Sequence, residues 1–251
     1  MLAGCLVKFD MSNNPLFNFV GKKTLITGAT GGFGTELVRA FTAHGQEVTA
    51  TGRNSVKLDA LQSLGAKTIN LELTDPTAVK EFSKNSDAFD HIILAHGING
   101  PRPMRMISPE FSLNVIQTNL LSTLDLISNL LRARKINSPG RIIFISSISA
   151  HFGANNNTAY AASKAGGEAA MIGLARDLLH KGVTVNSIAP AAVETPLFEG
   201  AKPDILDEKN YPLGVGKVED ISKTVIFLCL EGSKYITGET IILDGGCTWL
   251  F

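Results

Sequence analysis

The sequence predicts an α/β protein: a single doubly wound domain in which helices flank both faces of a seven-stranded parallel sheet. Two observations support this prediction. From Lys23 onward, short apolar or β-branched runs alternate with longer helical-looking segments, a pattern typical of βαβ units. The chain has 251 residues, 44% of them hydrophobic, which suits one such domain and leaves no room for a separate second one.

The elements are expected to alternate along the chain, with strands at the short apolar runs and helices between them. The stretch from Pro190 to Gly216 carries no expected element, and long loops in compact domains are often lids or binding loops. The expected strands are Thr24–Thr27, Glu47–Thr51, Lys67–Leu71, His91–Ala95, Arg141–Ser146, Val183–Ile188 and Thr240–Leu243. The expected helices are Gly34–His44, Val56–Leu64, Pro76–Ser83, Phe111–Arg134, Thr158–Lys181 and Val218–Leu230.

Residues 1–20 precede the first expected strand and are predicted to be a weakly ordered N-terminal extension, so that the domain spans residues 21–251. Lys and Arg together number 23, as do Asp and Glu, and this balance argues against a broad nucleic-acid surface. No apolar run approaches the roughly 20 residues that a membrane-spanning helix needs. The sequence therefore predicts neither a nucleic-acid partner nor a membrane span.

The three cysteines, Cys5, Cys229 and Cys247, lie far apart in the sequence. They show neither the Cys-x-x-Cys spacing nor the Cys/His spacing that would indicate a disulfide framework or a zinc site. The prediction is therefore three reduced thiols in a cytoplasmic protein that has no metal site.

A glycine-rich segment, Thr27–Gly34, follows the first expected strand and leads into a helix. In this context glycines allow a tight turn, a close approach of the backbone to a pyrophosphate, and close packing of the helix. The free N–H groups at the start of the helix can bind anionic oxygens. The segment therefore predicts a nucleotide site that includes Gly28, Thr30, Gly31, Gly32, Phe33 and Gly34.

A second pattern joins a phenol to an ammonium. Tyr160 and Lys164 stand four residues apart, on one face of an expected helix, and Ser147 lies thirteen residues before Tyr160 at the end of an expected strand. A free phenol titrates near pH 10, but a neighbouring ammonium, helped by an oxidised nicotinamide, would lower its pKa. Tyr160 is therefore expected to act as a general acid in reduction or a general base in oxidation.

The glycine spacing G-x-x-x-G-x-G, the strand-end serine and the Tyr160/Lys164 pair together resemble the short-chain dehydrogenase/reductase family, over about residues 21 to 246. The resemblance implies a Rossmann-type fold and hydride transfer between a nicotinamide cofactor and a carbonyl or alcohol. It also implies that Ser147 orients the substrate oxygen and that Lys164 holds the nicotinamide ribose. Asn119 matches the family's asparagine, which supports a water relay to the lysine.

The residues at the end of the second strand, about 24 residues after Gly28, are expected to discriminate between NAD and NADP. In a protein that uses NAD, an Asp at this position would bind the ribose. Gly52 and Arg53 stand there instead, followed by Asn54. A glycine leaves room for a 2′-phosphate, and a guanidinium can hold it with two N–H donors. We therefore expect NADP(H) rather than NAD(H), with Arg53 and Asn54 in its site.

The resemblance places further cofactor contacts and also departs from the family pattern. The family usually reads Asn-Asn-Ala-Gly where this chain has Leu94–Gly97, so the hydrogen bonds of a sheet-bracing asparagine must be replaced or lost. His96 is open to two interpretations, an additional site group or a packed or solvent-facing histidine. The implied contacts are Glu72, Leu73, Ala95, His96, Gly97, Tyr160, Lys164, Pro190, Ala191, Val193 and Thr195.

The substrate is expected to be a 3-oxoacyl thioester of acyl carrier protein or coenzyme A. The loop from Pro196 to Tyr211 is short and mixed in charge, and it resembles that of the 3-oxoacyl-[acyl-carrier-protein] reductases. Four cations either form a basic rim for an acidic carrier or cap helix ends in the ordinary way. These cations are Arg132, Arg134, Lys135 and Lys181.

Two alternatives stay open. The polar residues 155–157 before Tyr160 would suit a sugar or nucleotide-sugar substrate. A catalytically silent NADP(H)-binding regulator is favoured by the altered Leu94–Gly97 and by Ala191, and disfavoured by the intact catalytic residues. The family usually forms dimers or tetramers through its two long helices, so a homo-oligomer is expected.

Overall fold

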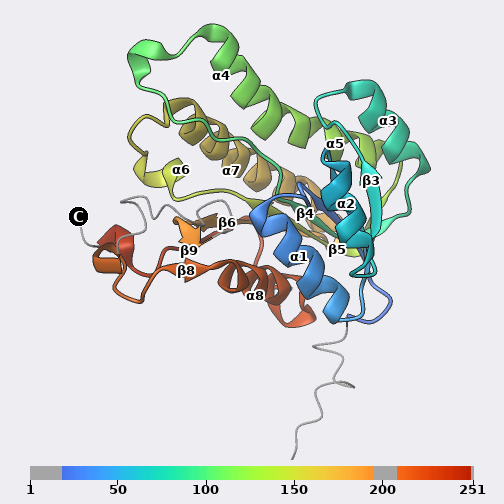
Figure 1. The fold of residues 1–251 in the computed structure, drawn as a ribbon. Helices are drawn as coiled ribbons and strands as arrows, with labels where there is room; N and C mark the ends of the chain where they lie inside the picture. Colours follow the sequence, from blue (N-terminus) through green and yellow to red (C-terminus); the bar gives the residue numbers. More distant parts are fainter. Residues whose placement is uncertain (1–18, 195–207, 250–251) are drawn as a thin grey trace, which may run out of the picture.

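A computed structural model of the chain describes residues 19–194 and 208–249. Seven strands form one parallel sheet in the order β3-β2-β1-β4-β5-β6-β9, with helices on both faces (Figure 1), which confirms the predicted architecture. The strands are β1 Lys23–Thr27, β2 Glu47–Gly52, β3 Lys67–Asn70, β4 Phe89–Leu94, β5 Ile136–Ile145, β6 Thr184–Pro190 and β9 Thr240–Leu243. The helices are α1 Gly32–Ala43, α2 Ser55–Gln62, α3 Pro76–Asn85, α4 Pro109–Ile116, α5 Ser122–Arg132, α6 Ser149–Phe152, α7 Thr158–Leu178 and α8 Val218–Cys229.

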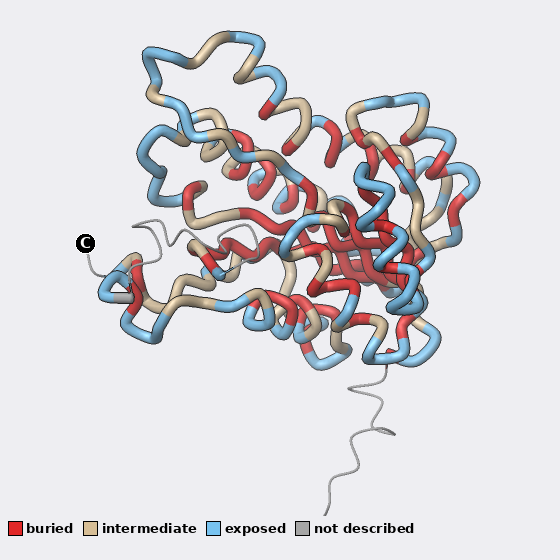
Figure 2. Tube along the Cα trace, viewed as in Figure 1, coloured by how far each residue is buried: buried red, intermediate tan, exposed pale blue. Residues whose placement is uncertain are grey.

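The apolar strands separate two hydrophobic layers. Successive residues of a strand point to opposite faces, so Ile142 packs with α3, α5 and α7, whereas Ile143 packs with α1, α2 and α8. Both side chains are fully buried. Figure 2 shows the same pattern, because the central strands are buried while the outer faces of the helices are exposed. The sheet is therefore buried on both faces, and several of the predicted site residues follow the carboxyl ends of its strands.

The expected helix Phe111–Arg134 is wrong as one continuous element. α4 ends at Ile116, one π-helical turn spans Gln117–Leu121, and α5 begins at Ser122. The side chain of Asn119 leaves the helix and binds both backbone groups of Ile98, at 2.8 and 3.0 Å. Such π turns are rare and occur mostly at functional sites, and here a tertiary contact accompanies the turn.

Smaller differences concern element ends. β5 begins at Ile136, five residues earlier than expected, because Ile136 pairs with Phe89 of β4 across a register shift. Within the expected loop, β7 (Val193–Glu194) and β8 (Gly216–Lys217) form a separate two-stranded parallel sheet. Phe19 belongs to the core, with 4% of its surface exposed, so the folded part includes two residues that lie before the expected boundary at residue 21. Residues 1–18, which include Cys5, lie outside the described part.

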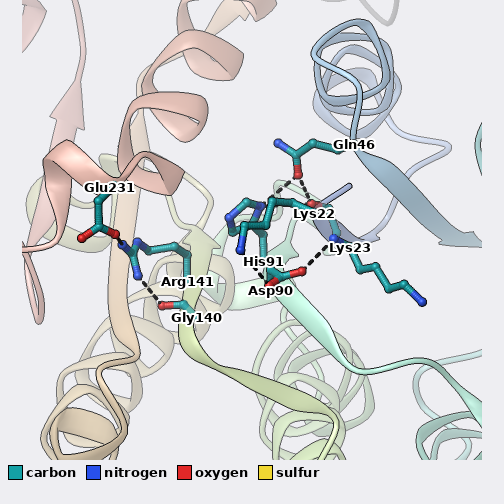
Figure 3. A network of polar contacts seen from close by, with 9 residues as sticks. Lys22, Lys23, Gln46, Asp90, His91, Gly140, Arg141 and Glu231 are labelled. Atoms are coloured by element: carbon teal, nitrogen blue, oxygen red, sulfur yellow. Dashed lines mark hydrogen bonds and ion pairs between the residues drawn. The ribbon is translucent and has the colours of Figure 1, made fainter. Parts of the chain in front are cut away.

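A buried histidine lies at the amino-terminal edge of the sheet. Nδ1 of His91 lies 2.9 Å from Oε1 of Gln46 and 3.2 Å from Oγ1 of Thr24 (Figure 3). Burial lowers the pKa of His91 to about 4; the carboxylate of Asp90 opposes this shift and the charge of Arg141 adds to it. The ring is therefore neutral at neutral pH.

We expect His91 to make the fold sensitive to acid. In the unfolded chain an imidazole titrates near pH 6.5, so between about pH 6.5 and 4 the unfolded state binds the extra proton. The contribution of His91 to stability is complete above that range and is lost as the pH falls through it. Urea unfolding across the range should show a shallower loss of unfolding free energy for His91→Leu than for the wild type. Equal slopes would contradict the assignment.

Candidate active site

The glycine segment forms a tight turn between β1 and α1. Gly28 has a φ of +64°, and a Cβ added there would lie 2.6 Å from the Cα of His96. A Cβ on Gly34 would lie 2.2 Å from the carbonyl oxygen of Gly28, so the helix packs directly on the turn. Gly31 caps α1 without a side chain, which leaves the first N–H groups of the helix accessible to an anion. Gly28 and Gly34 are therefore required for steric reasons.

Replacing Gly34 with Ala is expected to destabilise the turn and abolish nucleotide binding. The added methyl would meet backbone atoms, which cannot move aside as a side chain can, and overpacking of this kind typically costs about 1–3 kcal/mol. The matched control is Gly173→Ala in α7, where a Cβ would meet nothing within 4 Å. Thermal unfolding and NADPH titration of both variants check this. A Gly34→Ala protein that bound NADPH normally would refute the steric argument.

A cavity of about 210 Å³ opens beside this turn, at the carboxyl ends of β1, β2 and β4. It gathers predicted cofactor residues from four separate segments of the chain. The predicted residues in its lining are Gly28, Thr30, Gly31, Arg53, Glu72, Leu73, Ala95, His96 and Gly97. The lining also includes Thr51, Gly52, Leu71, Thr74, Ile98 and Thr118, which the sequence did not mark as cofactor contacts.

The other predicted cofactor residues have different positions. Gly32, Phe33 and Gly34 lie in the first turn of α1, and Asn54 caps α2 by accepting the N–H of Lys57 at 3.0 Å. Pro190 and Ala191 lie at the end of β6, where the carbonyl of Pro190 accepts the N–H of Ile148. Val193 lies in β7. Thr195 falls outside the described residues.

Two cations lie beside the part of the cavity that follows β2. Arg53 is exposed and pairs with Glu72, with Nη1 and Oε2 3.3 Å apart. The Nζ of Lys57 donates to the carbonyl of Thr30 in the glycine turn, at 3.3 Å. Gly52 faces the Thr30 side chain so closely that a Cβ would lie 2.7 Å from its methyl group. Lys57 was not among the residues predicted from the sequence. Its position four residues after Arg53, in the first turn of α2, could have indicated it.

Glu72 is held as a carboxylate. Burial alone would raise its pKa, but hydrogen bonds from the backbone and hydroxyl of Thr74, together with the Arg53 guanidinium, outweigh burial and lower the pKa. A negative charge therefore stands beside Arg53, and it competes with any anion that Arg53 would bind.

The structure brings Ser147, Tyr160 and Lys164 together. Ser147 follows the end of β5, and its hydroxyl lies close enough to the phenol of Tyr160, in the first turn of α7, to act on the pKa of that phenol. One turn further, Lys164 is 4% exposed, and its Nζ donates to the carbonyl of Ile145 at 2.7 Å. The Nζ lies 5.8 Å from the centre of the Tyr160 ring. The serine, the phenol and the ammonium thus form one group.

The pKa of the Tyr160 phenol differs from the expectation, which was that the neighbouring ammonium, helped by an oxidised nicotinamide, would lower it. Burial raises the pKa of Tyr160, and the nearby hydroxyl of Ser147 opposes that shift only partly. Burial also lowers the pKa of Lys164 to about 8, while the carboxylate of Glu168 acts in the opposite direction. The chain alone therefore favours a protonated phenol.

Asn119 connects the catalytic group to the cavity. Besides its two bonds to Ile98, it donates from Nδ2 to the hydroxyl of Ser163 at 2.9 Å, and that hydroxyl donates to the carbonyl of Tyr160. A Cβ on Gly97, which lines the cavity, would lie 3.2 Å from Oδ1 of Asn119 and 3.4 Å from Nζ of Lys164. The cavity and the catalytic residues are therefore neighbours, with Gly97 between them.

A further buried carboxylate lies one turn beyond Lys164, and the sequence reasoning missed it. Glu168 accepts a hydrogen bond from Ser146 and lies 2.9 Å from Nε2 of His151. This contact fastens α7 to the residue before Ser147. The signal available in the sequence was an acidic residue four positions after Lys164, on the same helix face.

The four cations considered for a carrier lie elsewhere. Residues 132–135 precede β5 and Lys181 precedes β6, so they lie at the amino ends of these strands, whereas Ser147 follows the carboxyl end of β5. Nζ of Lys135 donates to the carbonyl of Ser86 beyond the end of α3. These residues therefore do not form a rim around this chain's own active site.

Within the described ranges, no helix is long and apolar enough to cross a membrane. Among these same residues, no group of three or more His, Cys, Asp or Glu side chains is placed to hold a metal ion. Cys229 and Cys247 are buried free thiols.

Comparisons with known proteins agree with this site. A family profile described as enoyl-(acyl carrier protein) reductase matches residues 28–248. A 3-oxoacyl-[acyl-carrier-protein] reductase of Salmonella typhimurium is 35% identical over 243 residues, which cover 91% of this chain and 98% of that protein. The reductase of the same name from Escherichia coli is 32% identical over 241 residues, with the same coverage. A solved structure from Brucella melitensis, described as a short-chain dehydrogenase/reductase of the glucose/ribitol dehydrogenase type, has a TM-score of 0.85 and 27% identity and covers 92% of this chain and 98% of its own.

The chain therefore belongs to the short-chain dehydrogenase/reductase family, as its motifs predicted, and it is an oxidoreductase with a Rossmann-type fold. Within that family it is similar to the 3-oxoacyl-[acyl-carrier-protein] reductases. The family implies a nicotinamide cofactor, and the glycine turn beside the cavity fits one, because any side chain on Gly28 or Gly34 would collide with the neighbouring backbone.

Proposed function

We propose that this protein is an NADP(H)-dependent carbonyl reductase in which Tyr160 is the general acid, assisted by Ser147 and Lys164. The observation that carries the proposal is that the hydroxyl of Ser147, the phenol of Tyr160 and the buried ammonium of Lys164 lie together next to the cavity. A phenol, a hydroxyl and an ammonium suit proton delivery to a carbonyl oxygen. They have no evident use in a protein that only binds a nucleotide.

In this mechanism a nicotinamide cofactor supplies the hydride, and the chain supplies the proton and the placement. Ser147 orients the carbonyl oxygen, and Tyr160 gives that oxygen its phenolic proton. The raised pKa of Tyr160 keeps this proton in place at neutral pH, which supports the reductive direction. In oxidation Tyr160 would have to act as a base, which needs a lowered pKa of its phenol. The positive charge of an oxidised nicotinamide would favour that lowering.

The residues proposed to hold the cofactor come from three places. The glycine turn and the first N–H groups of α1 face the pyrophosphate. Arg53 and Lys57 provide positive charge for a 2′-phosphate, and this supports NADP(H) over NAD(H). Lys164 holds the nicotinamide ribose. Asn119, which holds Ile98 and Ser163 beside Lys164, supports a water relay to that lysine.

The substrate we propose is a 3-oxoacyl thioester. Its support is the similarity to curated reductases of 3-oxoacyl-[acyl-carrier-protein], which extends over nearly the whole length of both chains. A sugar is the second candidate, since a solved relative is described as a glucose/ribitol dehydrogenase type. Asn155 and Asn156, near the start of α7, are exposed and polar, which would suit hydroxyl groups.

The test is NADPH oxidation with a panel of 3-oxoacyl thioesters, keto-sugars and quinones, with NADH in parallel. We expect turnover with the thioesters. Turnover with keto-sugars alone would move the assignment to the second candidate. Tight NADPH binding without turnover of any carbonyl compound would indicate that the protein is a catalytically silent regulator and not an enzyme.

We propose a homo-oligomer as well. Exposed apolar side chains recur on the outer helices, and apolar residues in such positions are typical of subunit contacts. They are Leu113 in α4, Leu124 in α5 and Ile172 in α7, with Leu121 and Leu179 in adjoining turns. Light scattering of the purified protein distinguishes monomer, dimer and tetramer. The cytoplasmic location stays a prediction.

A further inference from the structure

Both ring nitrogens of His96 are engaged in hydrogen bonds. This residue follows β4 and is 8% exposed. Nδ1 lies 2.7 Å from Oγ1 of Thr27, while Nε2 lies 3.0 Å from Oγ of Ser122 and 3.1 Å from Oγ1 of Thr123. The imidazole therefore joins the last residue of β1 to the first turn of α5.

The hydroxyl groups of this network determine where its protons lie. Ser122 and Thr123 each donate to the carbonyl four residues earlier in the chain, at 2.7 and 3.1 Å. A hydroxyl has a single proton, so both oxygens can only accept from the imidazole. Nε2 must therefore carry the ring proton. Nδ1 accepts from Thr27, whose hydroxyl lies closer to Nδ1, at 2.7 Å, than to the carbonyl of Ile93, at 3.3 Å. Burial, together with the charge of Lys164, lowers the pKa of His96 to about 3, which agrees with a neutral ring.

The two ends of this bridge belong to different parts of the site. Thr27 directly precedes Gly28, and the backbone of His96 packs so closely on Gly28 that no Cβ fits there. At the other end, the hydroxyl of Thr123 holds the backbone carbonyl of Asn119, inside the π-helical turn. Through the imidazole, the glycine turn and the turn that carries Asn119 are tied together.

We propose that His96 is a positioning residue that holds the π-helical turn carrying Asn119 in place relative to the glycine turn. The effect on turnover rests on the proposed function, whereas the effect on the turn and on nucleotide binding does not.

The chain contains a matched control. His91 lies within β4, is 4% exposed and also contacts a threonine of β1, Thr24, but it lies near the amino end of β4, whereas His96 follows the carboxyl end. His96→Leu and His91→Leu each remove one buried imidazole and its hydrogen bonds. Any general loss of stability should therefore appear in both variants, and an effect on the site should appear only in His96→Leu.

We expect His96→Leu to lower kcat about 10-fold or more, because small misplacements of catalytic groups have large effects on rate, and to raise the Kd for NADPH several-fold. His91→Leu should change both values less than about twofold at a temperature where both variants are folded. His96→Gln, which keeps a donor and an acceptor, should recover part of the loss. Equal effects of the two leucine variants, or an unaltered His96→Leu enzyme, would overturn the proposal.

A second measurement is independent of turnover. Hydrogen exchange of the backbone amides in residues 117–123 should be faster in His96→Leu than in the wild type, and unchanged in His91→Leu. If no carbonyl is reduced by the wild type, the proposed function fails while this measurement and the NADPH titration still decide the role of His96. Unchanged exchange in His96→Leu would refute the bridge even in an active enzyme.

Discussion

Replacing Tyr160 with Phe is expected to abolish turnover and to leave NADPH binding largely intact. The change removes only the phenolic hydroxyl, which is the proton donor in the proposed mechanism, and the ring keeps its packing in α7. Positioned acid–base groups contribute about 100- to 10,000-fold to rate, so kcat should fall by that factor. Steady-state NADPH oxidation measures the loss, and a fluorescence titration measures the Kd for NADPH.

Tyr235→Phe is the matched control for this experiment. The Tyr235 side chain is almost fully exposed, so losing its hydroxyl should alter neither rate nor binding. If Tyr160→Phe retained wild-type turnover, the role of Tyr160 would be refuted. If both variants lost activity together, the cause would lie in assembly or folding and not in proton transfer.

Replacing Arg53 with Asp is expected to change the cofactor preference by about 100-fold. A charge-assisted hydrogen bond contributes about 1.5–3 kcal/mol, and the new carboxylate, standing beside Glu72, would also repel a 2′-phosphate. The KM for NADPH should therefore rise steeply, while the KM for NADH stays nearly constant or falls. The ratio of kcat/KM for the two cofactors is the measurement.

Two further variants sharpen this test. Arg39→Asp in α1 makes the same change of charge away from the cavity and should leave the cofactor ratio unchanged. Glu72→Gln removes the carboxylate that pairs with Arg53, so it should lower the KM for NADPH by a few-fold. An Arg53→Asp enzyme with the wild-type cofactor ratio would remove the basis for NADP(H).

Some parts of the site could be predicted from the sequence because the number of residues between two side chains already fixes their relative positions. The glycine turn needs only a strand before it and a helix after it, and the collisions that a Cβ would cause explain the glycines at positions 28 and 34. Tyr160 and Lys164 share a helix face because they are four residues apart. Ser147 lies beside them because it follows the carboxyl end of β5, at the end of the sheet where the glycine turn follows β1.

Other features depend on residues that are distant in sequence. The helix expected over Phe111–Arg134 contains a π-helical turn where Asn119 binds Ile98. Helical periodicity describes only neighbouring residues, so it cannot predict that contact. The pairing of Arg53 with Glu72 likewise joins the ends of two strands. Neither feature could be predicted from local patterns.

By itself, the sequence determined the class of fold and the family, and it predicted the proposed catalytic group, because strand alternation, glycine spacing and helical spacing are local properties of the chain. Only the tertiary structure decided the role of His96. The sequence left it open between a site group and a packed residue, since the choice depends on Thr27, Ser122 and Thr123 meeting around one ring. A buried imidazole takes its tautomer and its charge from those partners, and only the folded sheet brings them together.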